Sequence, residues 1–174
     1  MLRLLLLRHA KSDWSEPGLH DHDRPLNARG WKAADLAGQH IQQYQMVPAT
    51  ILCSTALRTR QTLMQLLPHL RADMKIQIMR DLYMQGDLQY IDTIRALGGP
   101  SSKLMLIGHN PAIQDTALEL AGKGNPELFD QMEEKFPTAA MAVIDFEAHR
   151  WSEVTPKQGR LVSFFQPRSL QVLP

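Results

Sequence analysis

The order of apolar segments along the chain predicts an α/β fold, with a largely parallel sheet covered by helices on both faces. Short apolar runs alternate with longer amphipathic segments through most of the sequence, as they do in βαβ units. The first run, residues 2–7, consists almost entirely of leucine, which is typical of a central strand buried on both faces. Residues 139–165 differ, because strand-like segments joined by short polar turns favour antiparallel pairing there.

Each expected element rests on a local pattern. The strands show short apolar or alternating runs and are expected at residues 2–7, 50–53, 75–79, 103–107, 139–146, 151–154 and 161–165. The helices show apolar residues at helical spacing and are expected at residues 28–44, 56–70, 88–97, 111–121 and 126–135. Asn27, Asp87 and Asn110 are the expected N-caps, because their side chains can accept hydrogen bonds from free helix N–H groups.

Length and composition exclude several classes of protein. The 174 residues predict one domain, residues 1–174, and the 44% apolar and 21% charged content is that of a globular protein. Nineteen basic and 18 acidic residues give a net charge of +1, so no nucleic-acid partner is expected. The apolar run at residues 4–7 is too short for a signal peptide, and no membrane partner is expected. Cys53 is the single cysteine, which is consistent with a cytoplasmic location.

Basic side chains follow three of the expected strands, at the point where each strand ends. Arg8 and His9 follow the first strand, Arg58 comes shortly after the second, and His109 follows the strand at residues 103–107. In open α/β sheets, ligands bind beyond the carboxyl ends of the strands, and helices that begin there favour anions. The sequence therefore predicts an anion site built from these four residues, which we call the four-residue cluster.

The residue types of the four-residue cluster match phosphoryl transfer. Guanidinium groups bind phosphate oxygens bidentately, and a neutral imidazole can attack phosphorus near pH 7 because its unperturbed pKa is about 6.5. The second imidazole can be a cationic oxygen ligand or a proton donor. A single Arg or His after a strand is more often a surface charge, but here three separate strand-to-helix junctions each place such a residue at the same edge of the sheet. Lys11 and Ser12 are either phosphate contacts or exposed surface, and Asn110 is a further phosphate-binding candidate.

Three ordered motifs resemble the signature of the histidine phosphatase superfamily, the phosphoglycerate mutase-like proteins. They are Leu6-Leu7-Arg8-His9-Ala10, residues 54–62 and Gly108-His109-Asn110-Pro111. Residues 8–14 and Asp23-Arg24-Pro25-Leu26 look most like the short phosphohistidine phosphatase branch. The resemblance implies a three-layer α/β/α sandwich around a mixed, mainly parallel six-stranded sheet with one antiparallel strand.

The resemblance also implies a reaction mechanism and a set of roles. His9 would attack phosphorus and become a covalent phosphohistidine, which water would then hydrolyse. Arg8, Arg58 and His109 would hold the phosphoryl oxygens, and no metal or organic cofactor is expected. Arg24 is similar to a basic residue near the pocket mouth of short members and would be a further phosphate contact.

One departure from the family pattern concerns the general acid. Larger members place a glutamate after the third strand, whereas residues 80–86 contain no glutamate, and the acid is Asp81, Asp13 or none. A phosphomonoester needs a proton for its alkoxide leaving group, but an imidazole leaves a phosphoramidate more easily. The expected substrate is therefore a protein-borne phosphohistidine. The alternatives are a small phosphomonoester, or a non-catalytic module that binds a phosphorylated partner.

Two other patterns favour a structural interpretation. Cys53 precedes Arg58 by five positions, one short of the spacing of cysteine phosphatases, and a buried inert thiol is expected. Residues 20–23, His-Asp-His-Asp, suggest a metal site, but the sequence places no further ligand, and a loop at the pocket entrance is preferred. Arg60 is expected on the solvated face of its helix.

Overall fold

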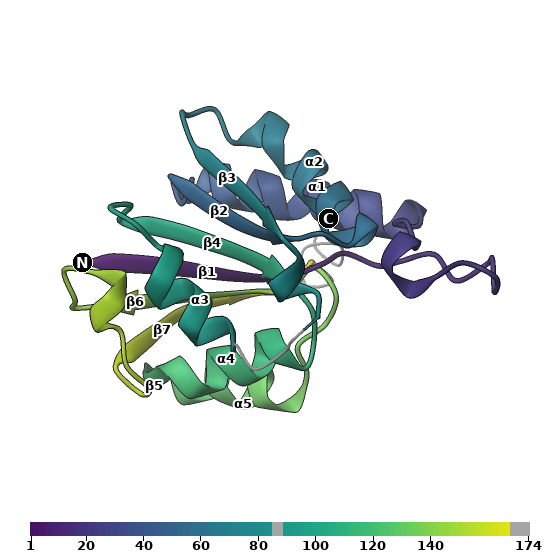
Figure 1. The fold of residues 1–174 in the computed structure, drawn as a ribbon. Coiled ribbons are helices and arrows are strands. Elements are labelled where there is room, and N and C mark those ends of the chain that lie inside the picture. The colour runs from purple at the N-terminus through teal and green to yellow at the C-terminus, as the bar shows by residue number, and fades with distance from the viewer. Residues whose placement is uncertain (85–88, 168–174) are drawn as a thin grey trace.

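The computed structural model describes residues 1–84 and 89–167, and its centre is a mixed seven-stranded sheet (Figure 1). The strands are β1 (Leu2–Arg8), β2 (Thr50–Ser54), β3 (Lys75–Met79), β4 (Lys103–Gly108), β5 (Ala121–Gly124), β6 (Met141–Phe146) and β7 (Gly159–Phe165). Their order is β3-β2-β4-β1-β6-β7-β5. Strand β6 is antiparallel to β1 and β7, and every other pair is parallel, which confirms a mainly parallel sheet with one antiparallel strand.

The helices form a layer on each face of the sheet, which confirms the α/β/α sandwich. They are α1 (Ala28–Gln43), α2 (Leu57–Leu66), α3 (Tyr90–Leu97), α4 (Ala112–Leu120) and α5 (Pro126–Glu134). Helices α1 and α2 cover one face, and α3, α4 and α5 cover the other (Figure 1). None of the helices in the described parts of the chain is long and apolar enough to cross a membrane.

The sheet has seven strands, one more than the resemblance implied, because β5 forms directly after the expected helix at residues 111–121, where no strand was predicted. Helix α4 ends at Leu120, and the next four residues form β5, which pairs with β7 with a register shift between Ala121 and Lys123. A side chain at Gly122 would collide with the backbone carbonyl of Lys157, so the glycine permits this close approach. A strand of sequence Ala-Gly-Lys-Gly has no alternating apolar pattern, which explains why the sequence did not indicate it.

The aromatic segment at residues 151–154 was expected to be a strand and is instead a short 3₁₀ helix, η4 (Trp151–Glu153). Trp151 is buried, and its indole N–H donates a hydrogen bond to the carbonyl of Ser101 at 2.6 Å. The segment therefore buries one large side chain against Gly98, at the end of α3, and Phe146, instead of pairing along its backbone.

Of the three expected N-caps, one is confirmed, one is wrong and one lies outside the described residues. Asn27 caps α1, since its side chain accepts a hydrogen bond from the N–H of Gly30 at 2.8 Å. Asp87 lies outside the described residues, and α3 begins after Gln89. Asn110 is not the N-cap of α4, which begins after Pro111, but its side chain still accepts a hydrogen bond from the N–H of Gln114.

Strand β1 is buried on both faces and holds the site in place. Leu4 and Leu6 pack into the core beneath α3, α4 and α5, whereas Leu5 and Leu7 pack beneath α1 and α2. All four side chains are fully buried, and each such burial contributes about 1.5–3 kcal/mol to folding. The two cores thus fix the carboxyl end of β1, where Arg8 lies.

Candidate active site

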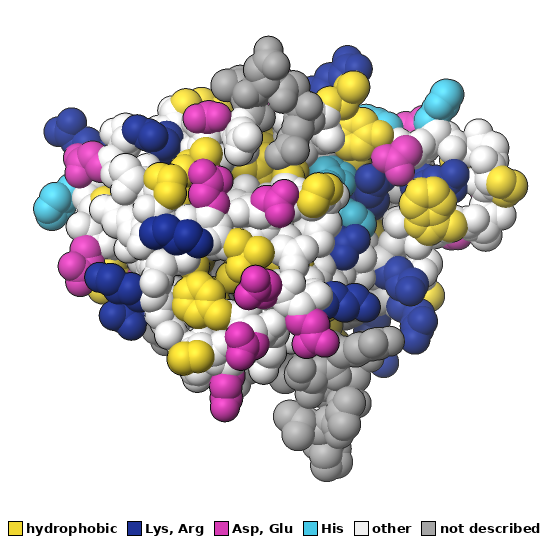
Figure 2. Space-filling view, turned by 90° about the horizontal axis from the view of Figure 1, so that it is seen from below, with side chains coloured by type: hydrophobic (Ala, Val, Ile, Leu, Met, Phe, Trp, Pro, Cys, Tyr) yellow, Lys and Arg dark blue, Asp and Glu magenta, His cyan; other side chains and the backbone are white. Residues whose placement is uncertain are grey.

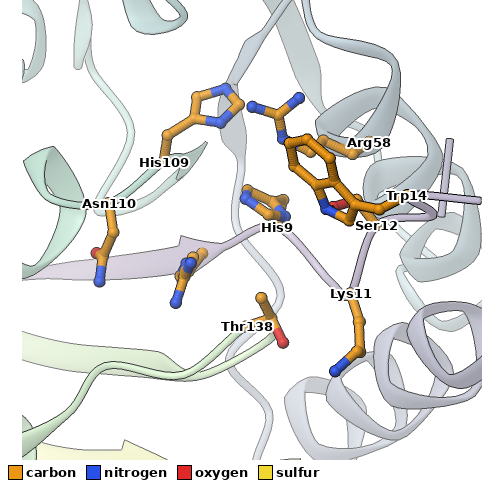
Figure 3. Close-up of a pocket in the computed structure, with 9 residues that line it drawn as sticks. His9, Lys11, Ser12, Trp14, Arg58, His109, Asn110 and Thr138 are labelled. Atoms are coloured by element: carbon orange, nitrogen blue, oxygen red, sulfur yellow. The ribbon is translucent and has the colours of Figure 1, made fainter. Parts of the chain in front are cut away.

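The carboxyl ends of β1, β2 and β4 meet at one edge of the sheet and open into a cavity of about 380 Å³. All members of the four-residue cluster line it: Arg8, His9, Arg58 and His109. In Figure 3, His9 lies between His109 and Arg58 on one side and Lys11 and Thr138 on the other. Two guanidinium groups and two imidazoles from segments about 50 positions apart in the sequence thus meet in one cavity.

His9 is held in one tautomer by the backbone. Its Nδ1 lies 2.7 Å from the carbonyl oxygen of Ala10, and because a carbonyl can only accept, Nδ1 carries the proton. The lone pair is therefore on Nε2. Burial lowers the pKa of His9 to about 3, and the charges of His109, Arg58 and Arg8 also act to lower it. A neutral imidazole with an available lone pair is a competent nucleophile at neutral pH.

His109 faces His9 with 5.3 Å between the ring centroids. Its Nε2 forms a hydrogen bond of 2.7 Å with the hydroxyl of Ser54, and its backbone N–H donates to the hydroxyl of Tyr90. Burial and the positive charge of Arg58 together lower the pKa of His109 to about 4, so the imidazole is neutral at pH 7 and not the cationic ligand that was expected. Nδ1 is buried and has no partner among the described residues, and a group of this kind is usually satisfied by a ligand or water.

Arg8 is anchored from one side only. One terminal nitrogen donates a hydrogen bond to the carbonyl of Phe136 at 2.9 Å, while the buried Nε has no partner among the described residues. Burial lowers the pKa of Arg8, and the neighbouring Arg58 lowers it further, although a guanidinium remains charged. Two such cations beside each other repel, and a bound anion relieves the repulsion.

Arg58 is held by the loop at the cavity entrance. It donates to the carbonyl of Asp21 at 2.7 Å and to the carboxylate of the same residue at 3.0 Å. The hydroxyl of Tyr83 donates to that carboxylate oxygen at 2.8 Å. Burial raises the pKa of Asp21, but the hydrogen bonds from Tyr83 and Arg58 outweigh it, so the pKa lies below its usual value. Asp21 is therefore a carboxylate in direct contact with the phosphate-binding candidate.

Comparison with known proteins agrees with this geometry. Residues 4–83 match the family model of the histidine phosphatase superfamily (branch 1). The chain belongs to the histidine phosphatase superfamily. An uncharacterized protein of Mycobacterium tuberculosis (strain CDC 1551) is 35% identical over 164 residues, which cover 93% of this chain and 100% of that protein.

Two solved structures of the superfamily share the fold over nearly the whole chain. One is named as a candidate phosphohistidine phosphatase, SixA, from Agrobacterium tumefaciens, with 28% identity, coverage of 95% and 98% and a TM-score of 0.77. The other carries the same description, from Nakamurella multipartitia, with 27% identity, coverage of 95% and 96% and a TM-score of 0.78. The chain thus shares the α/β/α architecture that the resemblance implied.

Arg24 does not line the catalytic cavity, although the sequence predicted it as a phosphate contact. Its two terminal nitrogens donate to the carbonyls of Glu16 and Leu19, at 3.0 and 3.1 Å. The guanidinium also stacks 4.0 Å from the centre of the Trp14 ring. Each terminal nitrogen thus makes one hydrogen bond to the loop at residues 14–24, while the buried Nε has no partner among the described residues, and Arg24 supports the wall of the cavity.

The other predicted phosphate contacts line the cavity but differ in whether their side chains already form hydrogen bonds within the protein. Lys11 is exposed, and the hydroxyl of Ser12 accepts a hydrogen bond from the indole N–H of Trp14 at 3.0 Å. Asn110 donates to the carbonyl of Phe136 at 3.2 Å, which ties it to the anchor of Arg8. Their roles as phosphate ligands remain predictions.

Sequence reasoning missed Thr138, Trp14 and the contact between Asp21 and Arg58. Thr138 lines the cavity because β6 begins where β1 ends: the N–H of Ala139 donates to the carbonyl of Arg8. Only knowledge of that antiparallel pairing could have placed it. For Asp21, the acidic entrance loop was the available signal, but its charge was not assigned to a partner.

The remaining predicted features lie away from the chemistry. Asp13 is half-buried and Asp81 is exposed, and neither carboxyl group lines either cavity. Arg60 is exposed on α2, as expected. Burial raises the pKa of Cys53 to about 12, which makes an inert thiol. Among residues 1–84 and 89–167, no group of three His, Cys, Asp or Glu side chains is placed to hold a metal ion.

Proposed function

We propose that this histidine phosphatase hydrolyses protein-borne phosphohistidine through a covalent phosphohistidine intermediate on His9. The observation that carries the proposal is the neutral, buried imidazole of His9, whose Nδ1 proton is held by Ala10 while the cations of the cavity surround it. Two similar solved structures are named as candidate phosphohistidine phosphatases, which supports this choice of substrate. The single buried cysteine supports a cytoplasmic location.

The first step transfers the phosphoryl group to His9. Nε2 of His9 attacks phosphorus in line, the new N–P bond forms, and the N–P bond to the substrate imidazole breaks. Arg8 and Arg58 neutralise the phosphoryl oxygens while the charge is redistributed, which is the main catalytic contribution in reactions of this class. The buried Nδ1 of His109 is available as a further oxygen ligand.

The leaving group of this first step needs no added proton. The substrate imidazole recovers its lone pair and departs neutral when its other nitrogen carries a proton, so one imidazole simply replaces another on phosphorus. The carboxylate that contacts Arg58, Asp21, has a lowered pKa and is not a proton donor at neutral pH. A phosphomonoester would instead release a poor alkoxide leaving group and require such a donor.

The second step returns His9 to its starting state. The oxygen of a water molecule attacks phosphorus, the N–P bond to His9 breaks, and both water protons leave with the phosphate. The lone pair returns to Nε2 while Nδ1 keeps its proton against the carbonyl of Ala10. The backbone contact thus holds the same tautomer through both steps.

A side-by-side assay tests the substrate and the mechanism. The wild type should hydrolyse a histidine-phosphorylated protein much faster than small phosphomonoesters, and a clear preference for phosphomonoesters would overturn the substrate assignment. His9→Ala should lose turnover while still binding tungstate, because the two arginines remain. A wild type that binds tungstate but hydrolyses neither class of compound would instead identify a binding module.

A further inference from the structure

A second cavity of about 370 Å³ adjoins the active site. It shares Arg8, Lys11 and Thr138 with the catalytic cavity, so the two form a continuous surface. Its lining consists of Arg8, Lys11, Arg29, Ala33, Lys135, Pro137, Thr138, Gln166 and Pro167, and we call it the basic groove. Figure 2 shows Lys and Arg side chains gathered beside a hollow that contains His side chains.

The charge of the basic groove is unusual for this chain. Four of its nine lining residues are basic and none is acidic, although the sequence contains 19 basic and 18 acidic residues. Helix α5 ends with two glutamates just before Lys135, yet neither lines the groove. Lys11, Arg29 and Lys135 are exposed and form no ion pair with any residue in the described parts of the chain. Their charge is therefore available to a partner.

The shape of the basic groove favours a protein over a small second anion. The three exposed cations come from separate places: the loop after β1, the first turn of α1 and the residue after α5. A site for one compact anion is usually a convergent set of fixed donors. Long, flexible side chains around an open groove instead suit several carboxylates spread over a surface.

We propose that the basic groove binds acidic side chains of the substrate protein that flank its phosphohistidine. This inference rests on the proposed function, because it assumes that the phosphoryl group in the catalytic cavity belongs to a protein. Exposed charges of this kind accelerate encounter and weaken with salt, since they are screened over about 8–10 Å at physiological ionic strength. The groove then selects acidic phosphohistidine proteins, while the four-residue cluster carries out the chemistry.

The test uses two synthetic phosphohistidine peptides that differ only in replacing Asp and Glu beside the phosphohistidine by Asn and Gln. The double variant Arg29→Ala/Lys135→Ala removes two charges that line the groove but not the catalytic cavity. Arg71→Ala/Lys75→Ala is the matched control, because it removes the same two residue types from exposed positions before and at the start of β3. Phosphoramidate serves as a small substrate for all three proteins.

For the wild type we expect a KM several-fold lower for the acidic peptide than for the neutral peptide. The groove variant should erase that difference, with kcat and the phosphoramidate rate within about twofold of wild type, while the control variant keeps it. An equal KM for both peptides in the wild type would overturn the proposal. So would a control variant that loses the KM difference as fully as the groove variant does. If the groove variant hydrolysed phosphoramidate as poorly as it hydrolysed the acidic peptide, the groove would instead belong to the phosphate site. If the wild type hydrolyses neither peptides nor phosphoramidate, the proposed function itself fails.

Discussion

The carboxylate of Asp21 accepts a hydrogen bond from the guanidinium of Arg58 at 3.0 Å, inside a site built for anions. Tyr83 donates to the same carboxylate oxygen, so this contact is held from two sides. Arg58 is oriented by the pair, but its charge is partly neutralised before any substrate arrives. A phosphoryl group that enters the cavity must share Arg58 with an anion already present.

Asp21→Asn should therefore tighten the binding of inorganic phosphate, by about threefold to tenfold, or up to about 1.4 kcal/mol. The substitution removes a negative charge beside the incoming dianion and leaves the backbone carbonyl contact to Arg58 intact. The inhibition constant of phosphate gives the measurement. Tyr83→Phe keeps the carboxylate and should produce no tightening. Weaker phosphate binding by Asp21→Asn would mean that orientation of Arg58 matters more than repulsion.

The stability of the protein should fall as the pH is lowered from about 6.5 toward 4. His9 has a pKa of about 3 in the folded protein and about 6.5 when unfolded, so the unfolded chain binds more protons in this window. The contribution is complete above pH 6.5 and is lost as the pH falls toward 3. Between pH 6.5 and pH 5, His9 alone should account for roughly 1–2 kcal/mol of the loss.

Urea unfolding of the wild type and His9→Asn at both pH values measures this contribution. The asparagine amide can replace the hydrogen bond of Nδ1 to Ala10 but does not titrate. The variant should therefore lose less stability than the wild type on acidification. Equal losses in the two proteins would show that the pKa of His9 is not lowered in the folded state.

A further prediction concerns the glycine before His109. A Cβ atom at Gly108 would lie 2.6 Å from the hydroxyl of Tyr90, which is buried. That hydroxyl accepts the N–H of His109 and donates to the carbonyl of Leu82. Gly108→Ala should cost about 1–3 kcal/mol of stability and displace His109, lowering kcat. Gly18→Ala is the control, since nothing lies within 4 Å of its added Cβ. A fully stable, fully active Gly108→Ala would contradict this account of the packing.

The convergence of the four-residue cluster could be predicted because its members lie at the carboxyl ends of β1 and β4 and in the first turn of the helix that follows β2. Parallel strands place their carboxyl ends at one edge, and the apolar runs before His9 and His109 show where those strands stop. The contact between Asp21 and Arg58 could not be predicted, because a loop 37 positions away must fold across the site to make it. Strand β5 was missed for another reason: its pairing depends on backbone approach at Gly122, which leaves no apolar pattern.

The sequence predicted Arg24 as a phosphate ligand, whereas in the structure its guanidinium donates to carbonyls of the neighbouring loop. Substitution of a phosphate ligand would weaken inhibition by phosphate. Substitution of a residue that only supports the loop would lower the free energy of unfolding and leave phosphate binding almost unchanged. Because its terminal nitrogens donate to Glu16 and Leu19, we expect Arg24→Gln to lose about 1–3 kcal/mol of stability and to change the inhibition constant of phosphate by less than twofold. Arg58→Gln is the positive control and should raise that constant at least tenfold. If Arg24→Gln raised it as much as Arg58→Gln, the guanidinium of Arg24 would have to leave its loop and bind the substrate.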